Sequence, residues 1–289
     1  MRVLCLILAF LGISLPLTVC ADTIYVATDW GGAIQKFDQN GNGSVLVSGL
    51  DLPSGLALDR NGNLLVAEQG NNRILEVDQT GATTVAIDGL DTPTGIAFDP
   101  DGNLFVANYW GYNIMKVAGD GTQTTFTETW WNHPNGMAFD KAGDLFVAFP
   151  NGNEVVEYSP DGRSSVLPLT GLNLPSSVAF DQAGNLYVAS SGNNLIYKYS
   201  AGGVQSVFAS GFYAYPTGLA FDSSGNLYVA DHWLGDDIIK VDPSGNETLF
   251  ATTLSGPAFI LVVVPEPPCL ALLAVGSVLV GWYSRRRWY

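Results

Sequence analysis

The stretch PTGIAFDPDGNLFVAN, residues 93–108, decides the fold because close copies of it recur along the chain. The copies lie 40 or 41 residues apart and begin at Pro53, Pro93, Pro134, Pro175 and Pro216. One further step of 41 residues reaches Pro257, which opens the segment PAFILVVV. A sequence that repeats at a fixed period of this length predicts an array of similar structural units.

Each repeat predicts four short strands. In the quoted copy, residues 95–99 form an apolar first strand, and the turn-forming segment PDGN follows. Residues 103–107 are almost wholly apolar, which predicts a second strand buried on both faces. A third strand is expected at 113–118 and a Thr-rich fourth strand at 124–129. Four strands in about 41 residues is typical of one blade of a β-propeller.

The two ends of the repeat region predict the number of blades. The segment TIYVA at 23–27 matches a second strand, and AIQKFD at 33–38 and SVLVSG at 44–49 supply a third and a fourth. The missing first strand is supplied by Pro257 and the residues after it. Five complete blades and this shared one predict an all-β, six-bladed propeller of four-stranded blades, whose closure removes the open sheet edge.

The pattern PxGxAFDxxGNLYVA resembles that of NHL repeats, and the resemblance covers about residues 22–264. It implies a propeller fold, but NHL propellers include binding platforms, sensor domains, lyases and lactonase-like relatives, so it names no single activity. The related gluconolactonase-like propellers hold a metal with Glu, Asn, Asn and Asp near the axis. Asn135 looks like one of these asparagines, whereas the glutamate and the aspartate have no clear counterpart.

The charge of the repeat region bears on its partners. Residues 22–264 carry 8 basic against 26 acidic side chains, so their net charge is −18. Such a body repels phosphate backbones, so nucleic acid is not expected as a partner. The acidity is typical of a soluble, self-repelling surface, with cation binding as the alternative. The region contains no cysteine, so packing rather than disulfides must hold it together.

The N-terminus predicts export. Arg2, the apolar run 3–17 and the small-residue site at 19–21 are typical of a secretory signal peptide spanning residues 1–21. Cleavage after Ala21 is expected. The alternative is a lipoprotein acylated at Cys20, although Val19 fits that pattern poorly.

The C-terminus, residues 265–289, predicts a sorting tail. An apolar stretch of 15 residues (269–283) is about 22 Å long as a helix, and the basic cluster after it predicts a cytoplasmic end. The order of a Pro-Glu-Pro motif, a short apolar span and terminal arginines resembles the PEP-CTERM tail of Gram-negative bacteria. The residues that carry this resemblance are Pro265, Glu266, Pro267, Arg285, Arg286 and Arg287.

That resemblance implies recognition by an exosortase-type sorting protease and a link to exopolysaccharide or biofilm production. It implies an exported protein of the outer surface or extracellular matrix, transiently anchored in the inner membrane through its tail. The alternative is a plain membrane anchor that is not cleaved.

The aromatic residues of the body predict one functional rim. In a propeller, the loops from second to third strands and from fourth strands to the next first strand emerge on the same rim. All five tryptophans and both histidines of the body fall in these loops, and the opposite rim carries mostly Asp, Gly, Asn, Ser and Pro. The predicted ligand-binding residues are Trp30, Tyr109, Trp110, Trp130, Trp131, His133, Tyr213, His232 and Trp233. The alternative is that several of these rings only pack against blade ends.

A second set of residues is predicted to lie at the mouth of the central channel, directly after the opening prolines. These residues are Ser54, Thr94, Asn135, Ser176 and Thr217. They are small and neutral, whereas a hard cation prefers several carboxylates. We therefore expect no metal site and no cofactor. The alternative is a divalent cation such as calcium, held by Glu68 and Asp231 together with Asp29 or Asn108.

These observations favour a binding or scaffold module for polysaccharide or protein, engaged through the aromatic rim. The first alternative is a metal-dependent gluconolactonase-like hydrolase or a propeller lyase, suggested by the family resemblance and Asn135. The second is a structural matrix component without a ligand. The sequence shows no nucleophile–base motif and no phosphate-binding loop, so catalytic residues are not assigned.

Overall fold

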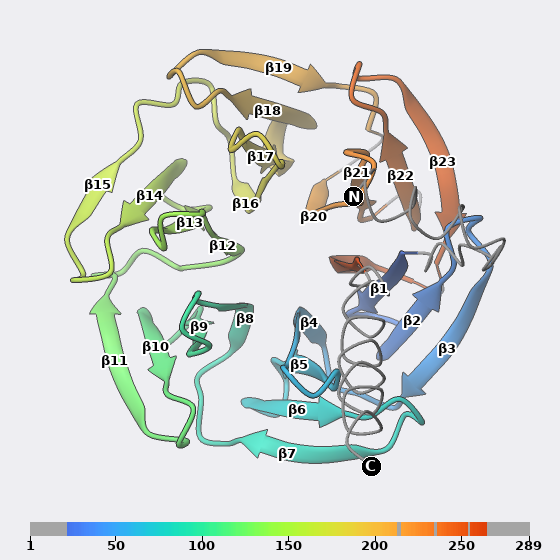
Figure 1. Ribbon diagram of the computed structural model, residues 1–289, viewed down its shortest axis with the longest axis vertical. Coiled ribbons are helices and arrows are strands. Elements are labelled where there is room, and N and C mark those ends of the chain that lie inside the picture. The colour runs from blue at the N-terminus through green and yellow to red at the C-terminus, as the bar shows by residue number, and fades with distance from the viewer. Residues whose placement is uncertain (1–21, 213–214, 234–235, 254, 265–289) are drawn as a thin grey trace, which may run out of the picture. The chain divides into compact units, whose positions relative to one another are not determined.

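The repeat region forms a ring of six four-stranded antiparallel sheets around a central channel (Figure 1). The computed structural model describes residues 22–212, 215–233, 236–253 and 255–264. Within each blade the first strand lies next to the channel and the fourth lies on the outside. The predicted all-β, six-bladed propeller is therefore confirmed.

The first three blades are built as follows. Blade A consists of β24 (Pro257–Val263), β1 (Thr23–Thr28), β2 (Ala33–Phe37) and β3 (Gly43–Ser48). Blade B consists of β4 (Pro53–Leu58), β5 (Leu64–Glu68), β6 (Arg73–Val77) and β7 (Thr83–Ile87). Blade C consists of β8 (Pro93–Phe98), β9 (Leu104–Asn108), β10 (Asn113–Val117) and β11 (Gln123–Glu128).

The other three blades follow the same order. Blade D consists of β12 (Met137–Phe139), β13 (Leu145–Phe149), β14 (Glu154–Tyr158) and β15 (Ser164–Val166). Blade E consists of β16 (Pro175–Phe180), β17 (Leu186–Ser190), β18 (Leu195–Tyr199) and β19 (Gln205–Ala209), with the 3-10 helix η1 (Ser191–Asn193) before β18. Blade F consists of β20 (Pro216–Phe221), β21 (Leu227–Asp231), β22 (Asp237–Val241) and β23 (Glu247–Thr252).

Blade A closes the ring with strands from both ends of the repeat region. β1 pairs antiparallel with β24, and Tyr25 lies opposite Leu261. The other edge of β1 pairs with β2, where Tyr25 lies opposite Lys36. β1 is thus hydrogen-bonded on both sides, as the blade count from the sequence predicts.

The core lies between neighbouring blades. The second strands are buried along their whole length, as their apolar sequences predict. Val66, Val106 and Val188 are completely buried. One cluster joins Ala67 of blade B to Val106 of blade C, and comparable clusters join the other neighbours. Apolar contact between stacked sheets therefore stabilises the ring.

A glycine near the start of most first strands allows neighbouring blades to approach closely at the channel. A Cβ atom on Gly95 would lie 2.3 Å from the carbonyl oxygen of Asn135 in the next blade. No side chain fits at this distance, which explains the PxG motif. The residue before the glycine is consequently held at the channel mouth.

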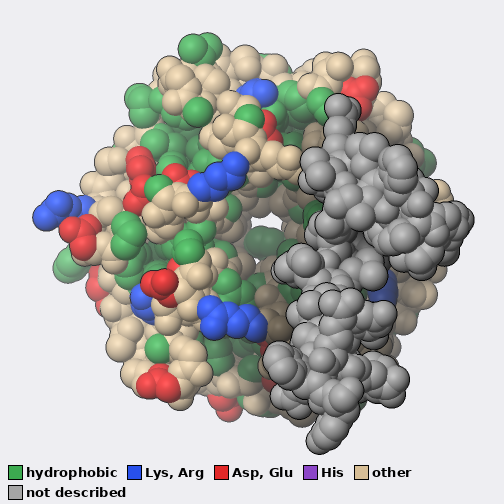
Figure 2. Space-filling view, in the orientation of Figure 1, with side chains coloured by type: hydrophobic (Ala, Val, Ile, Leu, Met, Phe, Trp, Pro, Cys, Tyr) green, Lys and Arg blue, Asp and Glu red, His purple; other side chains and the backbone are tan. Residues whose placement is uncertain are grey.

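The blades present two different rims. The turn rim contains the turns that follow first and third strands. There an aspartate accepts hydrogen bonds from its own turn, as when Asp99 accepts from Asn103 N at 2.7 Å and from Asn103 Nδ2 at 2.7 Å. The aromatic rim contains the remaining loops. Figure 2 shows one face of the ring, with the channel opening at its centre.

The terminal predictions lie outside the described residues. These are the signal peptide at 1–21 and the tail at 265–289, including its motif residues. Within the ranges that the structure describes, no helix is long and apolar enough to cross a membrane.

Candidate functional site

The mouth of the channel on the aromatic rim forms a cavity of about 260 Å³. Residues from blades A to F contribute to its lining, so the site exists only in the closed ring. The lining residues are Asp29, Gln69, Thr92, Thr94, Tyr109, Trp110, Asn135, Ser176, Thr217, His232, Ala258 and Phe259. Predicted mouth residues and predicted aromatic-rim residues therefore meet in one cavity, which we call the mouth pocket.

The hydroxyl groups at the mouth hold the blades together. Thr94 Oγ1 donates to the carbonyl of Pro134 in the next blade at 3.1 Å, and Thr217 Oγ1 donates to that of Pro257 at 3.1 Å. Ser54 and Ser176 bond in the same way to the opening prolines of their own neighbours. Ser54 is fully buried. These donors are used for blade packing, so only their oxygen lone pairs remain for a ligand.

Asn135 is the exception in this ring of hydroxyl groups. Its backbone N–H donates to Ala148 O, which fixes its place at the start of blade D. Its side-chain amide lines the mouth pocket and makes no hydrogen bond within the described part of the chain. One donor and acceptor group therefore faces the cavity without a protein partner.

The first aromatic cluster lies where blades C and D meet. We call it the Trp110 cluster, and it contains Tyr109, Trp110, Tyr112, Trp131 and His133. The His133 ring stacks on Tyr109, with centroids 4.3 Å apart, and meets Trp110 edge-on at 4.6 Å. His133 Nδ1 donates to the carbonyl of Tyr109 at 2.8 Å, because a carbonyl can only accept. His133 is thus buried as the centre of this cluster.

The second aromatic cluster lies where blades F and A meet. We call it the Trp30 cluster, and it contains Trp30, Tyr215, His232 and Trp233. Trp30 contacts His232 edge-on with centroids 4.8 Å apart and Trp233 at 6.3 Å. Trp233 also contacts Tyr215 at 5.2 Å. The contacts join the first and last repeats of the chain.

The two clusters face each other across the mouth. The junction of blades C and D and the junction of blades F and A are separated by three blades in either direction (Figure 1). Tyr109 and Trp110 line one side of the mouth pocket, and His232 lines it from the other cluster. The pocket therefore has a polar floor between two aromatic walls.

An imidazole–carboxylate pair lies in the pocket. His232 Nε2 is 3.1 Å from Asp29 Oδ2, and the two residues come from blades F and A. Asp29 also accepts from the Trp30 amide at 2.6 Å. A neutral imidazole that donates from Nε2 keeps Nδ1 as an acceptor, which is the arrangement of an oriented base.

Trp130 and Trp131 are the most exposed tryptophans of the described chain, at 83% and 80%. Both have positive φ angles, 49° and 71°. Their turn is fixed by Thr129, whose Oγ1 donates to Asn132 O at 2.5 Å. Trp131 contacts Tyr112 with centroids 5.1 Å apart. Tyr213, the last predicted ligand-binding residue, lies outside the described residues.

The gluconolactonase resemblance implies Glu, Asn, Asn and Asp as metal ligands, whereas the lining of the mouth pocket contains one carboxylate, Asp29, and one asparagine, Asn135. In the described ranges, no group of three or more His, Cys, Asp or Glu side chains could hold a metal ion. The other polar residues of the lining are His232, Gln69, Tyr109 and the hydroxyl residues Thr92, Thr94, Ser176 and Thr217. The alternative cation site around Glu68 and Asp231 is contradicted at Glu68, because that carboxylate is buried and bound to Arg73 Nε at 2.5 Å and to the Asp51 amide. Burial acts to raise the pKa of Glu68, but the bonds from Arg73 and Asp51 outweigh it and lower the pKa.

Burial also shifts the pKa of a tyrosine that lines the mouth pocket. It raises the pKa of the Tyr109 phenol above its usual value, and the nearby Tyr112 adds to this effect. The Tyr109 hydroxyl is therefore neutral near pH 7 and can donate a hydrogen bond to a ligand.

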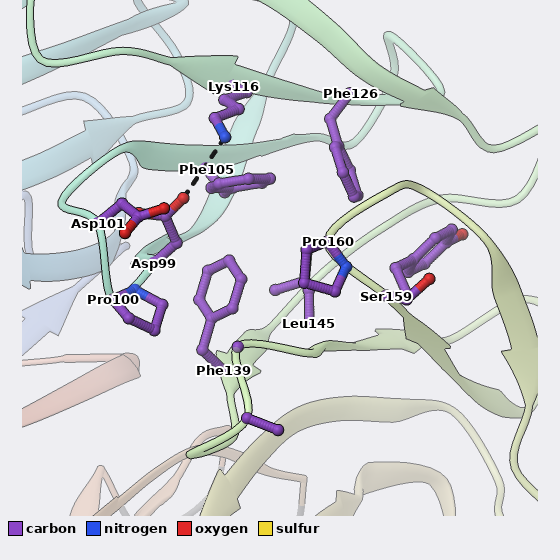
Figure 3. A pocket seen from close by; sticks show the side chains of 13 residues that line it. Asp99, Pro100, Asp101, Phe105, Lys116, Phe126, Phe139, Leu145, Ser159 and Pro160 are labelled. Carbon is purple, nitrogen blue, oxygen red and sulfur yellow. Dashed lines mark ion pairs between the residues drawn. The ribbon is translucent and has the colours of Figure 1, made fainter.

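A second cavity, of about 210 Å³, opens on the turn rim between blades C and D. Figure 3 shows Phe105, Phe126 and Phe139 around it, with Lys116 Nζ 3.5 Å from Asp99 Oδ2. A similar cavity lies between blades E and F, with Lys198 and Asp181 in equivalent positions. Because it recurs, we interpret it as a feature of blade packing rather than as a specific site.

Sequence reasoning located the aromatic rim but missed the pairing of His232 with Asp29. These residues are 203 positions apart and become neighbours only when the ring closes. The predicted register of blade A could have shown this, because it places the loop after β1 next to the loop after β21.

Residues 66–192, from β5 to η1, match the sequence profile of the family described as SMP-30/Gluconolactonase/LRE-like region. This is less than half of the chain. No curated protein matches the sequence significantly.

Solved structures share the fold. Virginiamycin B lyase from Staphylococcus aureus is 20% identical, with a TM-score of 0.61 over 72% of this chain and 73% of the lyase. A gluconolactonase from Xanthomonas campestris is 18% identical, with a TM-score of 0.65 over 83% and 88%. A chain of the nidogen/laminin complex is 18% identical, with a TM-score of 0.75 over 85% and 100%. At these identities the similarity shows the fold alone.

Proposed function

We propose that the mouth pocket on the aromatic rim is the functional site, and that the propeller acts as a binding module for polysaccharide or protein. The observation that carries this proposal is the placement of the two aromatic clusters on opposite sides of a polar pocket. Aromatic faces bind apolar surfaces of a ligand while nearby polar groups orient it.

The terminal segments support a proposed location. A signal peptide at 1–21 would export the chain, and the tail at 265–289 would direct it to an exosortase-type protease at the inner membrane. The module would then work at the outer surface or in the extracellular matrix, close to exopolysaccharide. The intact mass of the protein recovered from the native host tests both cleavages.

The binding function is tested with a Trp110→Ala, Trp233→Ala double variant. Isothermal titration against ligands selected on a glycan and protein array should show at least a tenfold loss of affinity. Val207→Ala serves as the matched control, because Val207 is an exposed apolar residue of the outer strand β19. Unchanged binding by the double variant would reject the mouth pocket as the site.

A second function, a lactone hydrolase or a lyase, receives more support from the comparisons. The matched family profile and the solved relatives include gluconolactonases and a virginiamycin B lyase. The supporting feature of this chain is the His232–Asp29 pair in the pocket, since both reactions need a base that removes a proton.

The two functions are separated by turnover. Gluconolactone and a streptogramin B antibiotic should be incubated with the purified chain, with and without added divalent cations, and followed by pH-stat and mass spectrometry. Turnover that falls at least a hundredfold in His232→Gln and less in Asp29→Asn would establish the enzymatic function. No turnover of any tested substrate, together with array binding, would favour the binding module.

A further inference from the structure

The Trp110 cluster forms a track that leads from the outer rim to the mouth pocket. Trp131, which is almost fully exposed, contacts Tyr112 at 5.1 Å, and Tyr112 contacts Trp110 at 6.5 Å. Trp110 and Tyr109, 5.5 Å apart, line the pocket. Aromatic surface is therefore continuous over a distance that the pocket alone does not cover.

The Trp30 cluster continues the aromatic surface on the other side of the mouth. Tyr215, Trp233 and Trp30 follow one another at 5.2 and 6.3 Å, and Trp30 contacts His232 in the pocket wall. Trp30, Trp110 and Trp233 each remain more than half exposed. Two tracks therefore run from opposite blade junctions to one central pocket.

The size of the pocket limits what can enter it. Its 260 Å³ lie below the roughly 300–1,000 Å³ typical of sites for drug-sized ligands. One small ring fits inside, while a longer ligand would have to continue over the aromatic tracks. An extended chain of rings matches this combination of a small pocket and long tracks.

The charges around the pocket exclude a polyanion. Among the described residues that line it, Asp29 carries a negative charge, and neither lysine nor arginine is present. The whole repeat region carries a net charge of −18. Acidic polymers are repelled by such a field, so a neutral ligand is favoured over an acidic one.

The polar floor favours a sugar over a peptide. Asn135 offers an unpaired amide, and the hydroxyl oxygens of Thr94 and Thr217 keep free lone pairs. A sugar ring has apolar C–H faces for the aromatic walls and equatorial hydroxyls for these groups. The hydrogen bond from Thr129 Oγ1 to Asn132 O fixes the turn that carries Trp131, so the outer end of the track is formed before a ligand arrives.

We infer that the ligand is a neutral, extended oligosaccharide with one unit in the mouth pocket and the following units on the aromatic tracks. The inference rests on the proposed binding function of the mouth pocket and adds the class and length of its ligand.

Titration with neutral gluco-oligosaccharides of the cello and malto series, from one to eight units, tests the inference on the purified chain. Affinity for at least one series should rise tenfold or more between two and six units and change less than twofold between 50 and 500 mM NaCl. Oligogalacturonates of equal length should bind at least tenfold more weakly. Flat dependence on length, or stronger binding of the galacturonates, would overturn the inference.

Two variants separate the track from the pocket. Trp131→Ala should remove the gain from long chains and leave the Kd for two units within twofold. Trp110→Ala should weaken chains of every length, and Val207→Ala should change neither. If Trp131→Ala does not change the affinity for long oligosaccharides, the aromatic track is rejected as a binding surface, while the mouth pocket remains the proposed site. If Trp110→Ala has no effect at any length, or if no neutral sugar binds, the proposed glycan site fails as a whole.

Discussion

Both rims of the propeller contain left-handed backbone, but in the part of the chain that the structure describes only the aromatic rim places residues other than glycine in it. On the turn rim, every positive φ angle among the described residues belongs to a glycine, such as Gly102 at 86° or Gly184 at 82°. On the aromatic rim, twelve residues other than glycine adopt positive φ, including Tyr112, Trp131 and Leu174. Left-handed backbone costs about 1–2 kcal/mol for such residues.

This difference indicates which rim carries the residues that are specific to individual blades. Turns on the turn rim follow one design, in which an aspartate accepts hydrogen bonds from its own turn. Loops on the aromatic rim also repeat their backbone turns, since positive φ recurs at Asn72, Tyr112, Asn153 and Asn194, but the side chains at these positions differ from blade to blade. Strain is greatest where a large residue such as Tyr112 or Trp131 takes this conformation, and such positions are candidates for function. The turn rim should therefore determine stability, while the aromatic rim determines binding.

The largest expected effect is on the turn rim. Asp222 is buried, accepts hydrogen bonds from Ser224 N, Asn226 N and Asn226 Nδ2, and lies 3.6 Å from Lys240 Nζ. Asp222→Ala should lower the free energy of unfolding in urea by about 2–3 kcal/mol, because these donors lose a charged acceptor. Asp242→Ala, in the exposed turn of the same blade, should have a clearly smaller effect. Equal losses of stability in the two variants would mean that the burial of the aspartate does not determine how much its turn contributes to stability.

The next effect comes from exchanging residue types between the rims. Gly184→Ala places a side chain at φ 82° with no atom within 4 Å of the new Cβ, so the loss of about 1 kcal/mol reports backbone strain alone. Leu174→Gly on the aromatic rim relieves strain but makes the unfolded chain more flexible, so stability should change by less than ~0.5 kcal/mol. Thermal unfolding measures both. A large decrease in the stability of Leu174→Gly would show that the positive φ angle of Leu174 does not destabilise the folded protein.

A smaller and opposite effect is expected in blade D. Asp144 occupies the position that asparagine has in other turns, and burial and the adjacent Asp140 raise its pKa. A carboxyl with a raised pKa destabilises the fold when it is ionised, and this loss disappears below its unfolded pKa of about 3.9. Asp144→Asn should therefore stabilise the protein by about 0.5–1 kcal/mol at pH 7, because it removes a partly buried charge that the Asp140 carboxylate repels.

The pH dependence of that gain provides the control. Urea unfolding of wild type and Asp144→Asn should give a difference that shrinks as the pH falls from 7 towards 4. A constant difference would mean that a change other than the removal of charge repulsion stabilises the variant.

The smallest effect on stability is predicted for the aromatic rim. Trp110 is 56% exposed, so Trp110→Ala should change the free energy of unfolding by less than about 0.5 kcal/mol. Circular dichroism and urea unfolding check this directly. A loss of 2 kcal/mol would instead show that the Trp110 cluster packs the junction of blades C and D, which is the alternative interpretation of these rings.

The fold could be predicted almost completely because it depends on local patterns repeated at a fixed period. The apolar second strands, the Asp-containing turns and the step to Pro257 each identify one part of every blade. Their consistency also predicts the closure by β24, which the register of β1 confirms. Blade D departs in detail, since its first strand contains only Met137–Phe139.

The candidate site was less predictable because it depends on contacts between distant repeats. The sequence places Trp110 and His232 on one rim, but it does not show that Asp29 binds His232 or that Asn135 keeps a free amide. It also suggested Glu68 as a cation ligand, whereas its partner Arg73 lies one loop away. Such pairings depend on side-chain direction in the closed ring, which a periodic pattern does not encode.

The pairing of β1 with β24 ties folding to the completion of the chain. Tyr25 is among the first residues of the ring to be synthesised, and Leu261, which lies opposite it, is among the last. At roughly 5–20 residues per second, a ribosome needs about 10–50 s to pass from one to the other. During that time β1 has a bare edge that could join another chain. A nascent copy of this protein must therefore be kept apart from its neighbours until its final strand emerges.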